Sequence, residues 1–134
     1  MKKDYIFAVG RKKESSARVR LYPSGEKGVI TVNGQPIETY FPGNVAKAQY
    51  MAPFFLTKTN DVFMVTVKVA GGGKSGQLSA VTHGIARALA LYSKDAFRPI
   101  LKLHGLLTRD ARVRERRKVG TGGKARRQKQ SPKR

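Results

Sequence analysis

Apolar and polar residues alternate in the first part of the chain, which is the period of β-strands that bury one face. The alternation predicts strands over residues 5–9 and 17–21, and a β-branched run predicts a third strand over residues 29–32. In the second segment, Arg18 and Arg20 occupy the positions between apolar residues. We therefore expect one face of this strand to be buried and the other to be cationic.

Turn residues separate these segments. Pro23-Ser24-Gly25 precedes the third strand, and Asn33-Gly34, a strong hairpin signal, follows it. The short connections favour an antiparallel meander of the first three strands. A fourth strand is predicted over residues 62–69, where valines at alternate positions share one face.

The clearest helix signal lies between residues 75 and 92. Apolar residues recur there at helical spacings from Leu78 to Tyr92, which places them on one stripe of a helix that begins at Ser75 or Gly76. Small residues in the same segment would let the helix pack close to a sheet: Ala80, Gly84, Ala86 and Ala90.

Two shorter helices complete the pattern. Asn44 is a suitable N-cap for a helix over residues 45–52, and Pro53 is expected to end it. Residues 94–102 predict a third helix, broken near Pro99.

The predicted fold class is α+β. Four strands form a mostly antiparallel sheet, helices cover one face, and the opposite face carries Arg18, Arg20 and Lys68. The globular domain is expected to span residues 1–108, and an extended basic C-terminal arm follows over residues 109–134.

Positive charge dominates the composition and is concentrated in the arm. The chain of 134 residues has 28 Lys or Arg against 8 Asp or Glu, a net charge of +20. Half of this charge lies in residues 109–134, whose only large apolar residues are Val113 and Val119. We do not expect such a segment to fold alone, because little apolar burial offsets the entropy of ordering it. A dense polyanion would order it, and in a cell that usually means nucleic acid.

Other classes of function are disfavoured. No run approaches the ~20 apolar residues of a membrane-spanning helix, and no signal peptide is recognised. The chain has no cysteine, which excludes disulfides and thiolate metal sites and fits a reducing cytosol. His83 and His104 lack ligand-spaced partners, so we predict no metal, no cofactor and no catalytic residues. Six aromatic residues are assigned to the core rather than to a base-stacking surface: Tyr5, Phe7, Phe54, Phe55, Phe63 and Tyr92.

Residues 70–77 form a glycine-rich loop between the fourth strand and the long helix. Gly73-Lys74-Ser75 matches the second half of a nucleotide P-loop, but Lys68 stands where the first glycine is needed. A dinucleotide fingerprint is formally present, but the repeated βαβ setting that it requires is missing. Two interpretations remain open: the loop amides and Lys74 bind a phosphate of an RNA backbone, or the glycines merely permit the turn.

The glycine loop is one of four sequence blocks that occur together in a known family. In chain order the blocks are Ala8-Val9-Gly10-Arg11-Lys12-Lys13-Glu14 with Ala17-Arg18-Val19; Val32-Asn33-Gly34-Gln35 with Tyr40-Phe41; Gly71-Gly72-Gly73-Lys74-Ser75-Gly76-Gln77 with Ala80 and Gly84-Ile85-Ala86-Arg87-Ala88-Leu89; and Leu107-Thr108-Arg109-Asp110-Ala111-Arg112 with Glu115-Arg116-Arg117-Lys118 and Lys124-Ala125-Arg126-Arg127. In this order they resemble the small ribosomal subunit protein S9 family of the bacterial type, over about residues 5–134.

The resemblance implies a fold like domain two of ribosomal protein S5 and a structural, non-enzymatic function in the head of the small ribosomal subunit. The implied partners are small-subunit ribosomal RNA, peptidyl-site transfer RNA and neighbouring ribosomal proteins, with no membrane. The implied location is the cytoplasmic ribosome; an organellar ribosome is an alternative, although no transit peptide is recognised. The arm would run through ribosomal RNA to the peptidyl site.

Site residues follow from the matching blocks and from the basic sheet face. Those expected to bind ribosomal RNA are Arg11, Lys12, Lys13, Arg18, Arg20, Lys74, Arg87, Arg109, Arg112, Arg114, Arg116, Arg117, Lys118, Lys124, Arg126 and Arg127. Those expected to contact transfer RNA are Ser131, Lys133 and Arg134. The tip departs from the family pattern because Pro132 is inserted after Ser131 and no aromatic residue precedes it, although the terminal Lys-Arg pair is retained.

Two other functions remain as alternatives. A free-standing chaperone-like or regulatory RNA-binding protein would use the same domain and arm, but it would not stay with small subunits during sedimentation. A nucleotide-binding enzyme built on the glycine loop would have to bind ATP or NAD.

Overall fold

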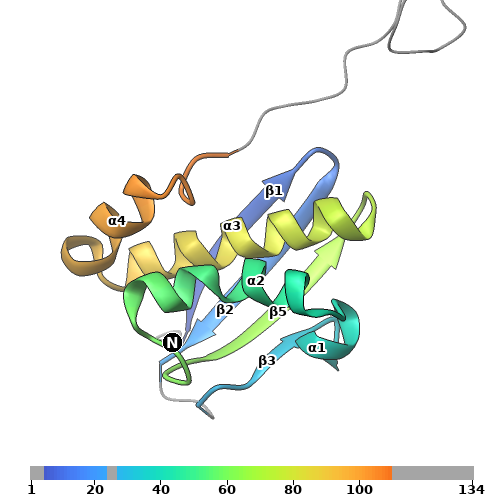
Figure 1. Ribbon diagram of the computed structural model, residues 1–134, viewed down its shortest axis with the longest axis horizontal. Helices are drawn as coiled ribbons and strands as arrows, with labels where there is room; N and C mark the ends of the chain where they lie inside the picture. The colour runs from blue at the N-terminus through green and yellow to red at the C-terminus, as the bar shows by residue number, and fades with distance from the viewer. Residues whose placement is uncertain (1–4, 24–26, 110–134) are drawn as a thin grey trace, which may run out of the picture.

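The computed structural model describes residues 5–23 and 27–109 as two layers, with helices packed over one face of a five-stranded sheet (Figure 1). The elements in chain order are β1 (Ile6–Lys12), β2 (Ser15–Tyr22), β3 (Ile30–Val32), β4 (Gln35–Pro36), α1 (Ile37–Tyr40), α2 (Asn44–Thr57), β5 (Met64–Ala70), α3 (Lys74–Tyr92) and α4 (Lys94–Leu103). The predicted α+β class is confirmed.

Strands β1 and β2 form a hairpin at the positions where the sequence alternates. The two strands are antiparallel and pair over the whole length of β1. A two-residue turn at Lys13 and Glu14 joins them, with Lys13 at a φ of 53°. The apolar residues of β2 are buried, whereas Arg18 and Arg20 are exposed on the other face. The alternating pattern therefore separates the core side of the hairpin from a cationic side, as expected.

The predicted meander is wrong beyond this hairpin. Strand β5 pairs with β2, and the sheet order is β1-β2-β5-β3-β4, with β3 running parallel to β5. The four-stranded, mostly antiparallel prediction also missed β4, a fifth strand of two residues. Burial explains this order. Val65, Val67 and Val69 of β5 are buried, and a strand in the middle of the sheet is covered by paired strands on both of its edges. Helix α2 lies in the connection between β3 and β5, which is the kind of crossover that parallel strands require.

The Asn33-Gly34 turn is confirmed, and it joins β3 to β4, the short strand that the sequence did not predict. Asn33 and Gly34 have φ values of 51° and 82° and connect β3 to β4. Positive φ at both positions is what a two-residue hairpin turn of this type requires. The Asn33 side chain also reaches β5, where Nδ2 donates to the Val69 carbonyl at 3.2 Å and Oδ1 accepts from the Val69 N–H at 2.9 Å. A side-chain amide thus extends the hydrogen bonding of β5 past the end of β3.

Helix α3 approaches strand β1 with no side chain between the two backbones. Gly10 of β1 faces Ala80 and Gly84 of α3, and a Cβ at Gly10 would overlap the Ala80 carbonyl and the Gly84 backbone. A Cβ at Gly84 would in turn meet Val19 Cγ2 at 2.6 Å. Residues of the predicted apolar stripe are fully buried in the same core: Val81, Ile85 and Leu89. The small residues of α3 therefore have the packing function that their sequence positions predicted.

Two prolines lie inside helices that they were expected to end or break. Helix α2 continues through Pro53 to Thr57, and α4 continues through Pro99 to Leu103. A proline removes one backbone hydrogen bond from a helix. Packing outweighs this loss, because Pro53 itself is buried and Leu101, just after Pro99, is fully buried.

The helix starts differ slightly from the predictions. Asn44 is the first residue of α2, and the preceding Gly43, at a φ of 102°, takes the N-cap position without a side-chain hydrogen bond. Helix α3 begins at Lys74, directly after an extended Gly73. Residues 94–103 form the third predicted helix as one uninterrupted element.

Adding a methyl group at Gly10 tests the contact between α3 and β1. We expect Gly10→Ala to lower the free energy of unfolding by about 3 kcal/mol, because its Cβ must displace the backbone of α3. Thermal unfolding measures the loss. Gly73→Ala is the matched control: no atom lies within 4 Å of its added Cβ, so its cost should stay within about 1 kcal/mol. Equal melting temperatures for the two variants would contradict the proposed packing.

Candidate nucleic-acid interface

The described residues predicted to bind RNA lie in three regions. We call the first the hairpin end; it combines the tip of the β1–β2 hairpin with the start of the basic segment and contains Arg11, Lys12, Lys13, Arg87 and Arg109. We call the second the open face, which is the helix-free side of the sheet, with Arg18 and Arg20. The third is the glycine loop before α3, with Lys74.

At the hairpin end, side chains of α3 occupy the outer edge of β1. Arg87 Nη1 donates to the Val9 carbonyl at 2.6 Å, and His83 Nδ1 accepts from the Arg11 N–H at 3.4 Å. Strand β1 is the last strand on its side of the sheet, so these backbone groups have no strand partner there. The two side chains are four residues apart on α3 and therefore reach the same edge.

His83 links three segments that are distant in the sequence. Its Nδ1 accepts a hydrogen bond from β1, so the ring proton lies on Nε2, which donates to the Leu107 carbonyl at 3.3 Å. Burial lowers the pKa of His83, and nearby Arg87 and Arg109 lower it further, while the Leu107 contact acts in the opposite direction. The neutral ring is the form that fits this position. The sequence predicted neither a metal-binding nor a catalytic role for His83, and its structural contacts with β1 and Leu107 were not predicted. The four-residue spacing between His83 and Arg87 is the signal that could have indicated them.

The segment after α4 leads to the hairpin tip. Gly105, at a φ of 73°, turns the chain, and the Leu106 N–H donates to the Leu101 carbonyl at 3.0 Å. Leu107 is partly buried against the core, and Arg109 Nη2 donates to the Lys13 carbonyl at 3.4 Å. Residue 109, where the basic arm is predicted to begin, therefore lies beside the cations of the hairpin tip.

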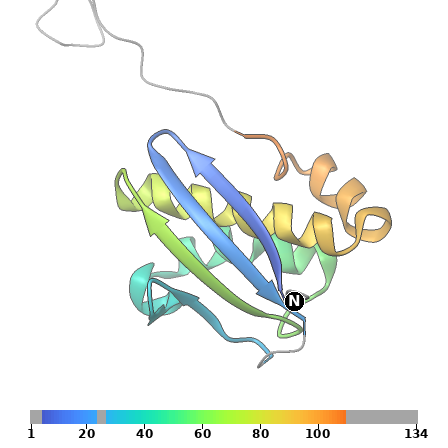
Figure 2. The same ribbon diagram turned by 180° about the vertical axis from the view of Figure 1, so that it is seen from behind.

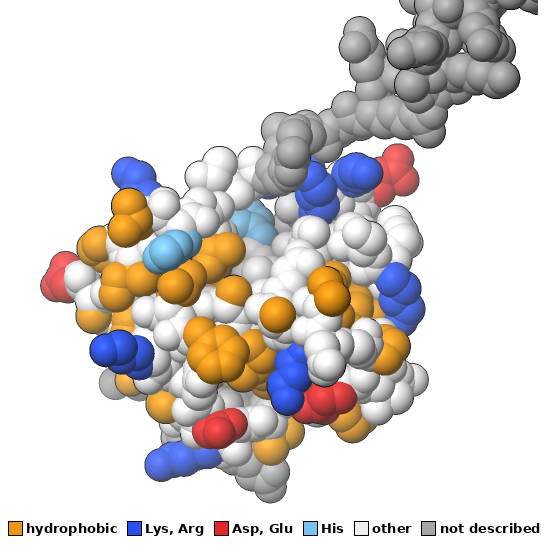
Figure 3. Space-filling view, viewed as in Figure 1, with side chains coloured by type: hydrophobic (Ala, Val, Ile, Leu, Met, Phe, Trp, Pro, Cys, Tyr) orange, Lys and Arg blue, Asp and Glu red, His pale blue; other side chains and the backbone are white. Residues whose placement is uncertain are grey.

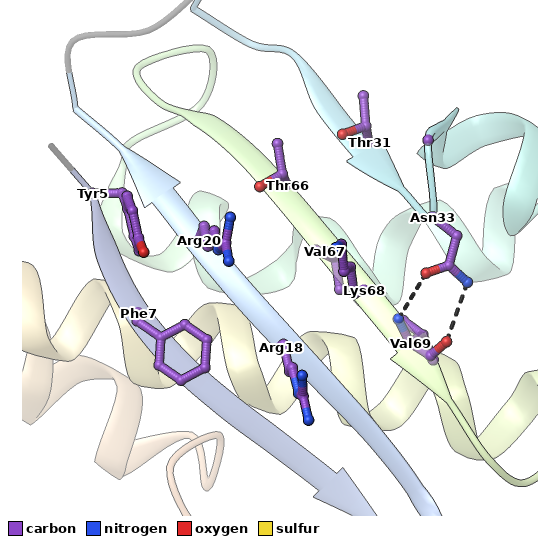
Figure 4. Close-up of a pocket in the computed structure, with 11 residues that line it drawn as sticks. Tyr5, Phe7, Arg18, Arg20, Thr31, Asn33, Thr66, Val67, Lys68 and Val69 are labelled. Atoms are coloured by element: carbon purple, nitrogen blue, oxygen red, sulfur yellow. Dashed lines mark hydrogen bonds between the residues drawn. The ribbon is translucent and has the colours of Figure 1, made fainter. Parts of the chain in front are cut away.

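The open face is cationic at its centre. Arg18 and Arg20 of β2 are exposed there, and Arg18 is the direct cross-strand partner of Lys68 of β5 (Figure 4). Within the described residues, no helix covers this face (Figure 2). The predicted cationic face of the sheet is confirmed, and Lys68 belongs to it, although it was omitted from the predicted RNA-binding set.

The helix side has a different character. Hydrophobic side chains gather over α4 and near the middle of this side, whereas Lys and Arg are scattered, mostly around its rim (Figure 3). The large exposed apolar residues of the helices are Val45, Phe55, Leu91, Tyr92, Ile100 and Leu103. A polyanion would therefore find closely spaced cations at the hairpin end and on the open face rather than over the helices.

The glycine loop packs against the hairpin tip. Gly71 and Gly72 have positive φ values of 80° and 64°, and a Cβ on either would collide with Glu14 or Ser15. The Gly71 carbonyl accepts from Ser15 Oγ at 3.0 Å and from Gln77 Nε2 at 3.1 Å. The glycines are thus required for this turn, which supports the structural interpretation of the loop.

Lys74 is held by the neighbouring aromatic residues. Its Nζ donates to the Tyr40 carbonyl at 3.2 Å and lies 3.3 Å from the Tyr40 ring centroid and 5.8 Å from that of Phe41. The Tyr40 hydroxyl is in turn bonded to Gln77 Oε1 at 2.7 Å. Lys74 therefore contributes to a local cation–π contact, and phosphate binding by Lys74 stays a prediction.

The assignment of all six aromatic residues to the core is partly wrong. Phe54 and Phe63 are buried, but Phe7, Phe55 and Tyr92 are 44%, 60% and 46% exposed. Successive residues of a strand point to opposite faces of the sheet. Ala8 is buried on the helix side, so the ring of its neighbour Phe7 lies on the open face. An alternating strand can bury only one of its two faces, and helices cover the other side of this sheet.

The remaining predicted residues lie outside the described part of the chain. For ribosomal RNA these are Arg112, Arg114, Arg116, Arg117, Lys118, Lys124, Arg126 and Arg127, and for transfer RNA they are Ser131, Lys133 and Arg134. Among the described residues, no group of three or more His, Asp or Glu side chains is placed to hold a metal ion. No helix in that part is long and apolar enough to cross a membrane.

Comparison with known proteins gives a consistent result over most of the chain. The family model described as ribosomal protein S9/S16 matches residues 10–134. Small ribosomal subunit protein uS9 of Maridesulfovibrio salexigens is 49% identical over 123 residues, which cover 92% of both chains. Proteins of the same name from Desulfovibrio desulfuricans and Lawsonia intracellularis are 47% and 45% identical over 120 residues, or 90% of each chain.

Acidification tests the position of His83. The ring is neutral in both the folded and the unfolded chain well above its ordinary pKa of about 6.5. As the pH falls below about 6.5, the unfolded chain takes up the proton first because the folded pKa is lower, so folding loses stability until the pH passes the folded pKa. We expect the melting temperature to fall less between pH 7.5 and 5.5 in His83→Gln than in the unmodified chain. Leu103→Gln, at an exposed position at the end of α4, adds no titratable group and should keep the original pH dependence. An unchanged slope in His83→Gln would contradict the assignment.

Proposed function

Because the chain belongs to the ribosomal protein S9/S16 family, we propose that it is a structural component of the small ribosomal subunit, bound to small-subunit ribosomal RNA in the subunit head. The family is one of ribosomal proteins and is structural rather than enzymatic. The relatives carry the name of a small-subunit protein, which supports this location. The proposed neighbours are other ribosomal proteins of the subunit head. The proposed location is the cytoplasmic ribosome.

The observation that carries the proposal is the distribution of charge about the hairpin end. Half of the net charge of +20 lies in residues 109–134, and Arg109 at the start of this segment contacts the carbonyl of Lys13. Arg109, the first cation of the arm, therefore lies beside the cations of the hairpin tip. Each phosphate that they neutralise releases counterions, which is the main source of affinity for nucleic acid.

Arginine suits the proposed contacts. Its planar guanidinium can bind a phosphate through two hydrogen bonds and stays charged in all surroundings. Eight of the twelve basic residues in the arm are arginines. Because the arm has no aromatic residue, we assign it to the RNA backbone and not to the bases.

The second part of the proposal concerns transfer RNA. We assign Ser131, Lys133 and Arg134 at the end of the chain to contacts with transfer RNA in the peptidyl site, as the family resemblance of the arm suggests. Pro132 departs from the family pattern at this tip and restricts the residue before it, Ser131.

Co-sedimentation of the tagged full chain with small subunits through a moderate-salt wash tests the proposal as a whole. Loss of the chain from the subunit would overturn the proposal.

Salt dependence tests the arm. Replacing Arg126 and Arg127 together by Ala should weaken binding to small-subunit RNA and make the plot of log K against log salt shallower by about 1.5, since two phosphate contacts are lost. Titrations at several salt concentrations give the slope. The control replaces Lys94 and Arg98, exposed on α4, in the same way; it should keep the original slope. Equal slopes for the two double variants would mean that the arm residues do not contact phosphates.

Removing the last two residues tests the tip. A chain without Lys133 and Arg134 should assemble into small subunits normally but release peptidyl-site transfer RNA faster, because two cations near the bound RNA are lost. The dissociation rate of transfer RNA from reconstituted subunits is the measurement. Removal of Lys102 by substitution with Ala serves as a control on the helix side. An unchanged dissociation rate after truncation would refute the tip assignment.

A further inference from the structure

The open face combines cations with an exposed aromatic ring, and the described elements leave it uncovered. In strand register, Phe7 lies opposite Arg20, and Arg20 lies opposite Thr66 of β5, which pairs in turn with Thr31 of β3. This row crosses four strands of the sheet (Figure 4). The second row holds Val9, Arg18 and Lys68. Cationic, aromatic and hydroxyl side chains therefore lie next to one another on this face.

The charges on this face point to an anionic ligand. Arg18 and Lys68 are direct cross-strand partners, and like charges at such positions repel each other. None of the described residues that line the shallow hollow over this face is acidic; they are Tyr5, Phe7, Arg18, Arg20, Thr31, Asn33, Gly34, Thr66, Val67, Lys68 and Val69. An anion between Arg18 and Lys68 would relieve the repulsion.

The aromatic groups point to a ligand with flat rings. Phe7 is 44% exposed, and Arg20, directly opposite it, has its guanidinium carbon 5.1 Å from the Tyr5 ring centroid. Tyr5 and Tyr22 contact each other with centroids 5.4 Å apart. Aromatic rings interleaved with cations on a sheet are typical of surfaces that bind single-stranded nucleic acid, where unpaired bases stack and phosphates meet the charges.

A protein partner fits this face less well. Protein interfaces deplete charged residues at their centre, whereas the centre of this face is occupied by Arg18, Arg20 and Lys68. Addition of a peptide strand at β1 is also hindered, because Arg87 and His83 already hold the outward backbone groups of Val9 and Arg11. On the other side of the face, both polar atoms of the Asn33 side chain are already hydrogen-bonded to the Val69 backbone.

We propose that the open face binds a single-stranded segment of RNA, with one unpaired base stacked on Phe7 and adjoining phosphates on Arg18, Arg20 and Lys68. Thr31 and Thr66 are direct register partners that both line the hollow, so their hydroxyls are assigned to the ribose or to base edges. The inference rests on the proposed function, since ribosomal RNA would supply the strand.

Binding of short RNA by full-length chains is the first test. The probe is a labelled oligouridylate of about ten nucleotides, in the range of site sizes for single-strand binding domains, at a salt concentration high enough to weaken contacts of the arm. We expect Phe7→Leu to weaken binding by roughly 5- to 100-fold, as loss of one stacked base does. Phe55→Leu, which alters an exposed Phe on α2, should bind like the unmodified chain. Equal affinities for the two variants would overturn the proposal.

A second pair of variants keeps the test valid if Phe7→Leu does not fold. Arg18→Gln with Lys68→Gln should make the salt slope for the same RNA shallower by about 1.5, whereas Lys94→Gln with Arg98→Gln on α4 should leave it unchanged. Thermal unfolding of each variant checks that the fold is kept. Equal slopes for the two double variants would count against phosphate binding on the open face.

Crosslinking in assembled small subunits identifies the occupant. After ultraviolet irradiation and trypsin digestion, residues 4–11 form one peptide with Tyr5 and Phe7, and residues 48–58 form another with Phe55. We expect RNA on the first peptide and not on the second. RNA on neither peptide, or a crosslink from the first peptide to a protein, would overturn the inference while leaving the proposed function intact. Failure of the unmodified chain to sediment with small subunits would instead overturn the proposed function.

Discussion

The close approach of helix α3 to strand β1 is the contact on which the rest of the structure depends. It is possible only because Gly10 and Gly84 meet without side chains, and an added Cβ at Gly10 would overlap the helix backbone. At this distance, side chains one turn apart on α3 reach past the strand, so that Arg87 and His83 contact the outward backbone groups of β1. His83 then contacts Leu107 in the segment after α4. The same packing contact therefore also places His83 where it contacts the segment that leads to Arg109.

Helix packing on a single side divides the surface between two kinds of chemistry. The helices bury the apolar side of the sheet and leave Arg18, Arg20 and Lys68 on the other. The cations of the hairpin tip lie at one end of the same strands, beside Arg109. Membership in the ribosomal protein S9/S16 family gives this arrangement a context, since ribosomes are rich in RNA and cationic surfaces attract RNA phosphates.

Much of the fold could be predicted because it depends on local patterns. Alternation predicts β1, β2 and β5, the period of 3.6 predicts α3, and Asn33-Gly34 predicts a two-residue turn. Strand order could not be predicted in the same way, because it depends on contacts between distant segments. Strand β5, whose three valines are buried, lies between β2 and β3, where both of its edges are paired. The proline predictions failed for a related reason: burial of Pro53 and Leu101 outweighs a local helix-breaking tendency. For the site, basic residues could be found by charge alone, but the exposure of Phe7 and the contacts of His83 depend on which side the helices cover.

Contacts at both borders of the described sheet hinder further strand pairing. At β1 the outward Val9 carbonyl and Arg11 N–H are already bonded to side chains, and at the other border β4 has only two residues, one of them Pro36, which has no N–H to donate. A sheet with one bare face would otherwise offer copies of the chain a template for edge-to-edge self-association. These features disfavour aggregation of newly made chains through their strands. On the β1 side one of the contacts comes from His83, which also contacts Leu107 in the segment leading to Arg109.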